Sequence, residues 1–240
     1  RFFQTQKIKG STFRLLVGMK KTLSILFFLI VFNGFSQSKM GGDFFGLTPA
    51  EFFKLSLLNE PITFQKVDYP LLHAAIFNLT NAERIQQKLA PLSFSKEAQL
   101  AAEGHAKDMV THRFYSHISP IKFKRTLRDR LNKQGINPKY LGENISSTFG
   151  IQYEEGKKIA KPRTLGEFRY LTASHSAPIP PHTYLTFAKM VVQLWMNSPG
   201  HRQNILNPIF THLGCGTHVY FDQNFYQMPY FMSVQNFIKN

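Results

Sequence analysis

Three stretches of the chain place apolar residues at helical spacing. The first starts at Tyr69-Pro70, where Pro70 suits the first turn of a helix, and it stops before Pro91. Its buried face is expected to hold Leu71, Ala75, Asn78, Ala82, Ile85 and Leu89. Ser95 is a good N-cap for a second helix, whose inner face would carry Ala98, Ala101, His105 and Met109. A third helix is predicted from about Thr183 to Met196, after the breaker Pro180-Pro181.

The C-terminal part of the chain changes to a period of two. Alternating positions run from Leu213 to Val219 and again from Met232 to Asn236, with Asp222-Gln223-Asn224 as turn residues between them. This pattern predicts an antiparallel hairpin or meander. Helices first and strands last, with an extended segment at Gly142-Glu143-Asn144-Ile145, predict an α+β sandwich.

The segments outside these elements suggest how the chain is organised. Residues 38–68 form a mixed lead in which a short helix is expected, and residues 69–240 form the main domain. Within it, residues 150–182 are polar, contain prolines and are predicted to be an irregular surface insertion.

Residues 1–37 have the composition of an export signal. A basic region opens at Met19-Lys20-Lys21, the apolar run Leu23–Phe32 follows, and small polar residues come next, as in a secretory signal peptide. Residues 1–18 precede Met19, the expected initiator, as an upstream extension. The ten-residue run is short beside the roughly 20 residues that span a bilayer, so an uncleaved anchor is the weaker alternative. We expect a secreted or periplasmic protein.

The composition is that of a globular protein, with 43% hydrophobic and 18% charged residues, and a formal net charge of +15. Six of the 29 basic residues lie in residues 1–37, which contain no acid. Six more lie between Lys122 and Lys133, where Phe123, Leu127 and Leu131 share one helical face. The preferred interpretation is an amphipathic helix with a solvated basic side. The alternative is a patch for an anionic envelope polymer or lipid headgroups, giving peripheral membrane contact. No nucleic-acid motif appears, and export argues against nucleic acid as a partner.

Three short motifs stand out among the polar residues. They are Tyr115-Ser116-His117-Ile118-Ser119-Pro120, then Gly142-Glu143-Asn144-Ile145, then the run from Trp195 to Leu206 that contains Ser198-Pro199-Gly200-His201-Arg202. In this order, and with Asn81-Ala82-Glu83-Arg84 before them and the strands at the C-terminus after them, they resemble the CAP superfamily. This family comprises cysteine-rich secretory proteins, antigen 5 and pathogenesis-related proteins, and the chain looks like its bacterial, SCP-like type. The resemblance covers about Tyr69 to Phe237.

The resemblance implies a three-layer α-β-α sandwich with a surface cleft lined by two His and two Glu. By their motifs, His117 and His201 would be the histidines and Glu143 the first glutamate. The place of the second glutamate holds Ser198. The family is often stapled by disulfides, whereas this chain has one cysteine, Cys215, which we expect to be a small buried hydrophobe.

The residue chemistry supports part of this implied site. Ser198 is expected to cap a short helix that begins at Pro199, placing His201 in the first turn, where a neutral imidazole is favoured. His117 and His201, with Glu143 as a further candidate, would suit zinc or another divalent cation. Alternatively, Glu143 accepts backbone N–H groups, and the two histidines bridge through water without metal. His105 is expected to be a core or rim histidine.

Three functions remain open from the sequence. The leading one is an exported binding module for a lipid, a cell-envelope component or a protein partner, held by the cleft of His117, Glu143 and His201. The second is a divalent-metal-dependent hydrolase that uses the same cleft; no catalytic residue is assigned, and without the second carboxylate it lacks a separate general acid or base. The third is a structural or interaction protein of the envelope with a vestigial cleft. Enzymatic activity is the less favoured interpretation.

Overall fold

The computed structural model describes residues 43–164, 166–171 and 177–240, which lie within one compact unit, Ser36–Asn240. The predicted signal segment 1–37 lies outside the described residues. The helices are α1 (Pro49–Phe52), η1 (Ser56–Asn59), α2 (Tyr69–Gln86), α3 (Lys96–Thr111), α4 (Leu127–Lys133), α5 (Tyr184–Asn197), α6 (Pro199–Ile205) and η2 (Gln223–Phe225). The strands are β1 (Ser93–Phe94), β2 (Tyr140–Phe149), β3 (His212–Asp222) and β4 (Met228–Lys239). In this part of the chain, no helix is long and apolar enough to cross a membrane.

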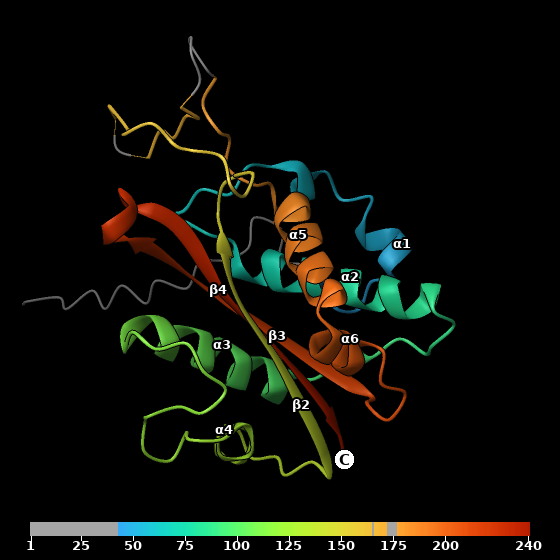
Figure 1. The fold of residues 1–240 in the computed structure, drawn as a ribbon. Coiled ribbons are helices and arrows are strands. Elements are labelled where there is room, and N and C mark those ends of the chain that lie inside the picture. Colours follow the sequence, from blue (N-terminus) through green and yellow to red (C-terminus); the bar gives the residue numbers. More distant parts are fainter. Residues whose placement is uncertain (1–42, 165, 172–176) are drawn as a thin grey trace, which may run out of the picture. The chain divides into compact units, whose positions relative to one another are not determined.

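A four-stranded sheet in the order β1-β3-β4-β2 forms the middle layer. β4 pairs antiparallel with β3 and β2, and the two-residue β1 pairs parallel with β3. α3 and α4 cover one face, while α2 and α5 cover the other, with α6 beside α5 and β2 (Figure 1). The predicted α+β fold, with its α-β-α layering, is confirmed.

The period-two pattern of β4 separates the two cores. Phe231 and Phe237 point to the α2/α5 side, where they join Phe187 and Trp195 in the larger buried cluster. Met232, Val234 and Ile238 point to the α3/α4 side and pack in smaller clusters beneath α3. Cys215 is a fully buried member of the larger cluster, and burial raises the pKa of its thiol. It is therefore a small core residue, as the sequence predicts.

The helix predictions agree with the structure except at three local points. Ile85, expected on the buried face of the first helix, is 49% exposed, and Leu89 lies beyond α2, which ends at Gln86. Ser95 caps α3 through its side chain, and Thr183 caps α5. Ser198 is the N-cap residue of α6, but its side chain makes no capping hydrogen bond, contrary to expectation. The amphipathic face proposed for the basic segment is also wrong at Phe123, which lies outside α4, has φ +63° and is 74% exposed.

The lead and the insertion both contribute to the core, and the lead contains the short helices α1 and η1 where one short helix was predicted. In the lead, Phe52 and Leu58 are fully buried against the α2/α5 side. The described residues of the insertion 150–182 form isolated bridges, such as Ile159 with Tyr170, in place of a helix or strand. Ile151, Phe168 and Ile179 nevertheless make a buried cluster with Met228 of β4. The apolar residues of this insertion, spaced without a period, therefore anchor it to the end of the sheet.

α3 lies against the bare backbone of β3 at two glycines. A Cβ at Gly214 would stand 2.0 Å from the backbone nitrogen of Gln99, and a Cβ at Gly216 would stand 2.2 Å from that of Glu103. Such contacts are far inside van der Waals separation, so any side chain here must push the helix off the strand. The two glycines thus set the distance between these layers.

Beyond its short pairing with β1, β3 has an open edge. There, side chains from α2 accept hydrogen bonds from the backbone N–H groups of the strand. The N–H of Thr217 donates to Nε2 of His73 at 2.9 Å, and the N–H of Val219 donates to the hydroxyl of Tyr69 at 3.3 Å. Tyr69 and His73 are one helical turn apart, which matches the two-residue spacing of outward-facing groups on the strand. These bonds give partners to backbone donors that a sheet edge leaves open.

We expect Gly216→Ala to lower the free energy of unfolding by about 3 kcal/mol, because the new methyl group meets the helix backbone. Gly104→Ala in α3 is the matched control, since nothing lies within 4 Å of its added Cβ. That change should raise stability by about 1 kcal/mol through helix propensity. Urea unfolding measures both, and a Gly216→Ala protein as stable as the parent would contradict the close approach.

Candidate functional site

Glu143 of β2 is the centre of the candidate cleft, and its two carboxylate oxygens have different partners. Oε1 accepts a hydrogen bond from Nδ1 of His117 at 2.8 Å, and Oε2 accepts one from Arg130 of α4 at 2.6 Å. Glu143 exposes 5% of its side chain and Arg130 exposes 2%. The carboxylate is therefore a buried, charge-paired group. The alternative in which it accepts mainly backbone N–H groups does not apply.

These partners keep Glu143 ionised. Burial raises the pKa of this carboxyl, but the hydrogen bond from His117 and the charge of Arg130 outweigh it, so the pKa lies below its ordinary value. A carboxylate that is ionised and bonded at both oxygens has no proton to give at neutral pH. Glu143 is thus suited to orienting its neighbours and unsuited to general acid chemistry.

His117 is held from three sides while its ring stays half exposed, with 52% of the side chain accessible. Because the carboxylate can only accept, Nδ1 carries a proton and donates it to Glu143. The backbone carbonyl of His117 accepts from Arg130 at 3.2 Å. The preceding carbonyl, that of Ser116, is bonded to Nε2 of buried His105 at 3.0 Å. The orientation of the His117 ring is therefore fixed, with Nε2 on the side away from Glu143.

His105 is the core histidine that its position on the apolar stripe predicts. It is fully buried in α3, and burial lowers its pKa to about 4. Since the carbonyl of Ser116 accepts, Nε2 donates. His105 therefore fixes the loop that carries His117 by its hydrogen bond to the carbonyl of Ser116.

His201 lies in the first turn of α6, which has Pro199 at its start. Burial and the neighbouring charge of His117 lower its pKa. A neutral ring is therefore favoured, as expected for this position. Its backbone carbonyl accepts a hydrogen bond from Asn144 at 3.1 Å, so the residue next to Glu143 fixes α6 against β2.

A second asparagine completes this connection. Nδ2 of Asn204 donates to Oδ1 of Asn144 at 2.9 Å and to the backbone carbonyl of Glu143 at 3.2 Å. The Gly142-Glu143-Asn144 motif thereby holds both histidine-bearing segments: the side chain of Glu143 binds His117, and that of Asn144 binds the α6 segment. In the structure, His117 is hydrogen-bonded directly to Glu143. His201 lies near enough that a positive charge on His117 lowers its pKa.

Arg130 is the site residue that sequence reasoning missed, because it was counted as part of a solvated basic face. Three of the six bases in 122–133 have partners within the protein: Lys124 pairs with Asp108 at 2.6 Å, Arg128 donates to the carbonyl of Pro138 while staying exposed, and Arg130 is buried. One signal was present in the sequence. Arg130 stands beside the apolar Leu127 and Leu131 on the inner face of α4.

The predicted metal ligands are His117 and His201, with Glu143 as a further candidate, all in the described part of the chain. No group of three or more His, Cys, Asp or Glu side chains there is placed to hold an ion. Metal binding by His117 and His201 stays a prediction. Both carboxylate oxygens of Glu143 are already bonded, one to His117 and one to Arg130.

Comparison with known sequences decides the family. The sequence profile of the cysteine-rich secretory protein family, the CAP domain, matches residues 77–237. The chain belongs to this family. The match begins within α2 and ends within β4, so it spans the segments that carry His117, Glu143 and His201.

Two Bacillus subtilis proteins are similar to this CAP domain. The uncharacterized protein YkwD is 32% identical over 141 residues, which is 59% of this chain and 40% of YkwD. The uncharacterized membrane protein YlbC is 30% identical over 151 residues, which is 62% of this chain and 33% of YlbC. The chain therefore matches well under half the length of either relative.

Solved structures with SCP-type domains are also similar. An extracellular SCP-domain protein from Bacillus anthracis has 28% identity and a TM-score of 0.48, with 75% of this chain and 45% of that chain covered. A cysteine-rich secretory protein from Staphylococcus aureus has 16% identity and a TM-score of 0.42, with 72% and 40% covered.

Arg130→Met should lower the free energy of unfolding at pH 7 by about 3–5 kcal/mol, because it leaves Glu143 buried without its cation. Adding Glu143→Gln to that variant should restore part of the loss. Arg125→Met, at an exposed base of the same segment, should change stability by less than about 0.5 kcal/mol. Urea unfolding of the four proteins measures this, and equal losses for Arg130→Met and Arg125→Met would refute the buried pair.

The same pair predicts a pH dependence for the parent protein. The folded-state pKa of Glu143 lies below its ordinary value of 4.5, so its stabilising contribution is complete above that pH. It is lost as the pH falls through the folded-state pKa. The slope of stability against pH below 4.5 should therefore be shallower in Glu143→Gln than in the parent, as urea unfolding from pH 3 to pH 7 would show.

Proposed function

We propose that this CAP domain is an exported binding module that holds a component of the cell envelope in the cleft of His117, Glu143 and His201. Export rests on the signal peptide predicted in residues 1–37. A lipid or a protein partner are the other ligand classes that fit an envelope protein of this family. Lys122, Arg125 and Lys133, which stay exposed, would add contact with anionic lipid headgroups.

The observation that carries this proposal is the full engagement of Glu143. Both its oxygens are bonded, its charge is balanced by Arg130, and Ser198 stands where a second carboxylate would be. The cleft therefore offers imidazole nitrogens and backbone groups, which recognise hydroxyl or amide groups of a ligand. It lacks the paired proton carriers that hydrolysis uses.

The donor set does not fit a resident catalytic zinc ion. Such ions are held by three protein ligands and keep one open position. Here His117 and His201 supply two nitrogens, and Glu143 already serves Arg130 and His117. One feature does favour the hydrolase alternative: a carboxylate that orients a histidine through Nδ1 is the usual support of a metal-binding imidazole. The experiment must therefore separate binding from metal chemistry.

The test compares the purified protein with His117→Ala and His201→Ala. Binding is measured by sedimentation with insoluble peptidoglycan and with phosphatidylglycerol vesicles, and metal content is measured by elemental analysis of protein prepared without chelator. We expect binding to one of the two probes that falls at least tenfold in both variants, with zinc well below one equivalent. Lys66→Ala, at an exposed residue of the lead segment, is the control for binding through surface charge.

Two results would count against the proposal. One equivalent of zinc that disappears in His201→Ala would favour the metal-dependent hydrolase. Binding that is absent, or that is unchanged in both cleft variants, would favour an envelope protein with a vestigial cleft.

A further inference from the structure

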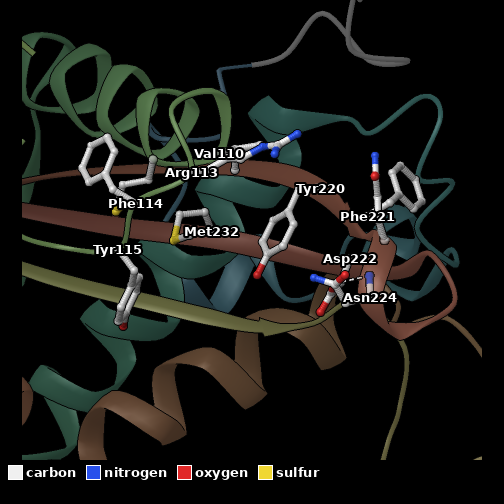
Figure 2. A pocket seen from close by; sticks show the side chains of 11 residues that line it. Val110, Arg113, Phe114, Tyr115, Tyr220, Phe221, Asp222, Asn224 and Met232 are labelled. Atoms are coloured by element: carbon white, nitrogen blue, oxygen red, sulfur yellow. Dashed lines mark hydrogen bonds between the residues drawn. The ribbon is translucent and has the colours of Figure 1, made fainter. Parts of the chain in front are cut away.

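The segment between α3 and β2 carries a large excess of positive charge. Residues 112–139 contain eight bases and one acid, Asp129. Two of the bases form ion pairs with acids of α3 and β2. A third, Arg113, shares with Asp222 the lining of the pocket beside the β3–β4 hairpin (Figure 2), so its charge is offset there. The five bases that are left are Lys122, Arg125, Arg128, Lys133 and Lys139.

The charges of these five bases are not balanced by nearby acids. All five are exposed, and none forms an ion pair with a residue that the structure describes. Asp129 caps α4 with its carboxylate and offsets one of the five charges. Of the acids on α3 that are not already paired with a base, Glu97 accepts a hydrogen bond from Ser95, and Glu103 lies 3.2 Å from Nδ1 of His73. The region around α4 therefore keeps a net positive charge.

The backbone that carries these bases is fixed on both sides of α4. Before the helix, Arg130 donates to the carbonyl of Lys124 at 3.2 Å, and the N–H of Ser119 donates to the carbonyl of Arg125 at 2.8 Å. After the helix, Arg128 donates to the carbonyl of Pro138 at 3.0 Å. Figure 1 shows α4 between these two segments, next to α3. A preformed surface loses less conformational freedom on binding.

Two aromatic rings accompany the bases, one before α4 and one after it. Phe123 is 74% exposed, and Nζ of Lys122 lies 4.9 Å from the centroid of its ring. Tyr140 is 41% exposed, and Nζ of Lys139 lies 5.4 Å from its centroid. Both are cation–π pairs. Each of them presents a flat apolar ring directly beside a positive charge.

We propose that the α4 surface, made of these five bases with Phe123 and Tyr140, binds an anionic glycan, a chain of sugar rings that carries carboxylate or phosphate groups. The C–H face of a sugar ring packs on the electron-rich face of an aromatic ring. Its anionic groups then pair with the cations beside that ring. Because α4 is about 10 Å long, the bases before and after it meet different units of one chain. The proposal does not depend on what the cleft binds.

Contact with lipid headgroups is the other role open to these bases, and two observations favour the glycan. Phe123 lies between Lys122 and Lys124, so its insertion into a membrane would carry the Lys122 ammonium toward the hydrocarbon. Burying one phenyl ring also contributes less than burying one acyl chain, which by itself attaches a protein only marginally. The α4 surface thus has the charge for a polyanion and too little apolar area for a membrane anchor.

The experiment is isothermal titration of the whole protein with three polymers: polygalacturonate, uncharged dextran, and polyglutamate, which is anionic but has no sugar rings. We expect polygalacturonate to bind about tenfold more tightly than dextran, because dextran cannot pair with the bases. It should bind about threefold more tightly than polyglutamate, which cannot stack on Phe123 and Tyr140. Raising the salt concentration should weaken polygalacturonate, since the bases are exposed and their charges are screened. Absence of polygalacturonate binding would overturn the proposal.

A pair of double variants separates the α4 surface from the net charge of the protein. Lys122→Gln with Arg125→Gln should weaken polygalacturonate about fivefold, the effect of losing two exposed ion pairs. Lys66→Gln with Lys88→Gln is the matched control, because it removes two exposed bases on either side of α2, across the sheet from α4. That change should alter the affinity by less than about twofold. Equal losses in the two double variants would overturn the proposal.

A second pair of variants tests the recognition of sugar rings. Phe123→Asn, which asparagine tolerates at φ +63°, should weaken polygalacturonate about fivefold and leave polyglutamate unchanged. Tyr226→Asn at the β3–β4 hairpin is the control, since it removes an exposed ring from a backbone at φ +53° and should change neither affinity. An unchanged polygalacturonate affinity in Phe123→Asn, or an equal loss for both polymers, would overturn the proposal.

Two further measurements identify other occupants. Phosphatidylglycerol vesicles that bind the parent and release Phe123→Asn, while polygalacturonate binding is unaffected, would assign the surface to a membrane and overturn the proposal. His201→Ala should leave polygalacturonate binding unchanged, and its loss there would place the glycan in the cleft. Urea unfolding should show the Phe123 and Lys122/Arg125 variants to be as stable as the parent, because the replaced side chains are exposed. A failure of this proposal is therefore distinct from a failure of the cleft to bind an envelope component.

Discussion

The contact of α3 with the backbone of β3 is the constraint on which the candidate site depends. Gly214 and Gly216 let the helix axis sit closer to the sheet than any side chain would permit. His105, at the inner face of that helix, then reaches the carbonyl of Ser116 and fixes the loop of His117. Met109, one turn further on, joins the buried cluster beneath α3. A shift of this one helix would therefore move the loop of His117 and this cluster together.

The cleft itself is organised by electrostatics around one buried carboxylate. Arg130 bonds to the side chain of Glu143 and to the backbone of His117, so a single cation fixes two of the three cleft residues. On the other side, Asn144 and Asn204 tie the α6 segment to the same strand. Burying an ion pair is tolerable only when its bonds are complete, which makes the arrangement rigid. The positions of His117 and of the backbone at His201 are consequently fixed relative to β2.

Much of this fold could be predicted from the sequence, because its helices and strands obey their periods. Ser95 and Thr183 mark helix starts by side-chain chemistry that acts within three residues. The partnership of Arg130 with Glu143 could not be found in this way, since thirteen residues and a loop separate them. The buried cluster of the insertion was missed for another reason: Ile151, Phe168 and Ile179 are too irregularly spaced to show a period, and their burial depends on contact with Met228 of β4. The family motifs located His117, Glu143 and His201, but the bonds among them required coordinates.

The side chains along the sheet edges have a consequence for assembly. On one edge, the side chains of Tyr69 and His73 accept hydrogen bonds from N–H groups of β3. On the other, backbone carbonyls of β2 accept hydrogen bonds from the side chains of Trp195, Tyr115 and Asn204. A strand from another molecule would have to displace these bonds before it could extend the sheet. The domain is thereby protected from polymerising edge to edge at high local concentration. Association with neighbouring molecules would then proceed through side chains and loops rather than through shared backbone pairing.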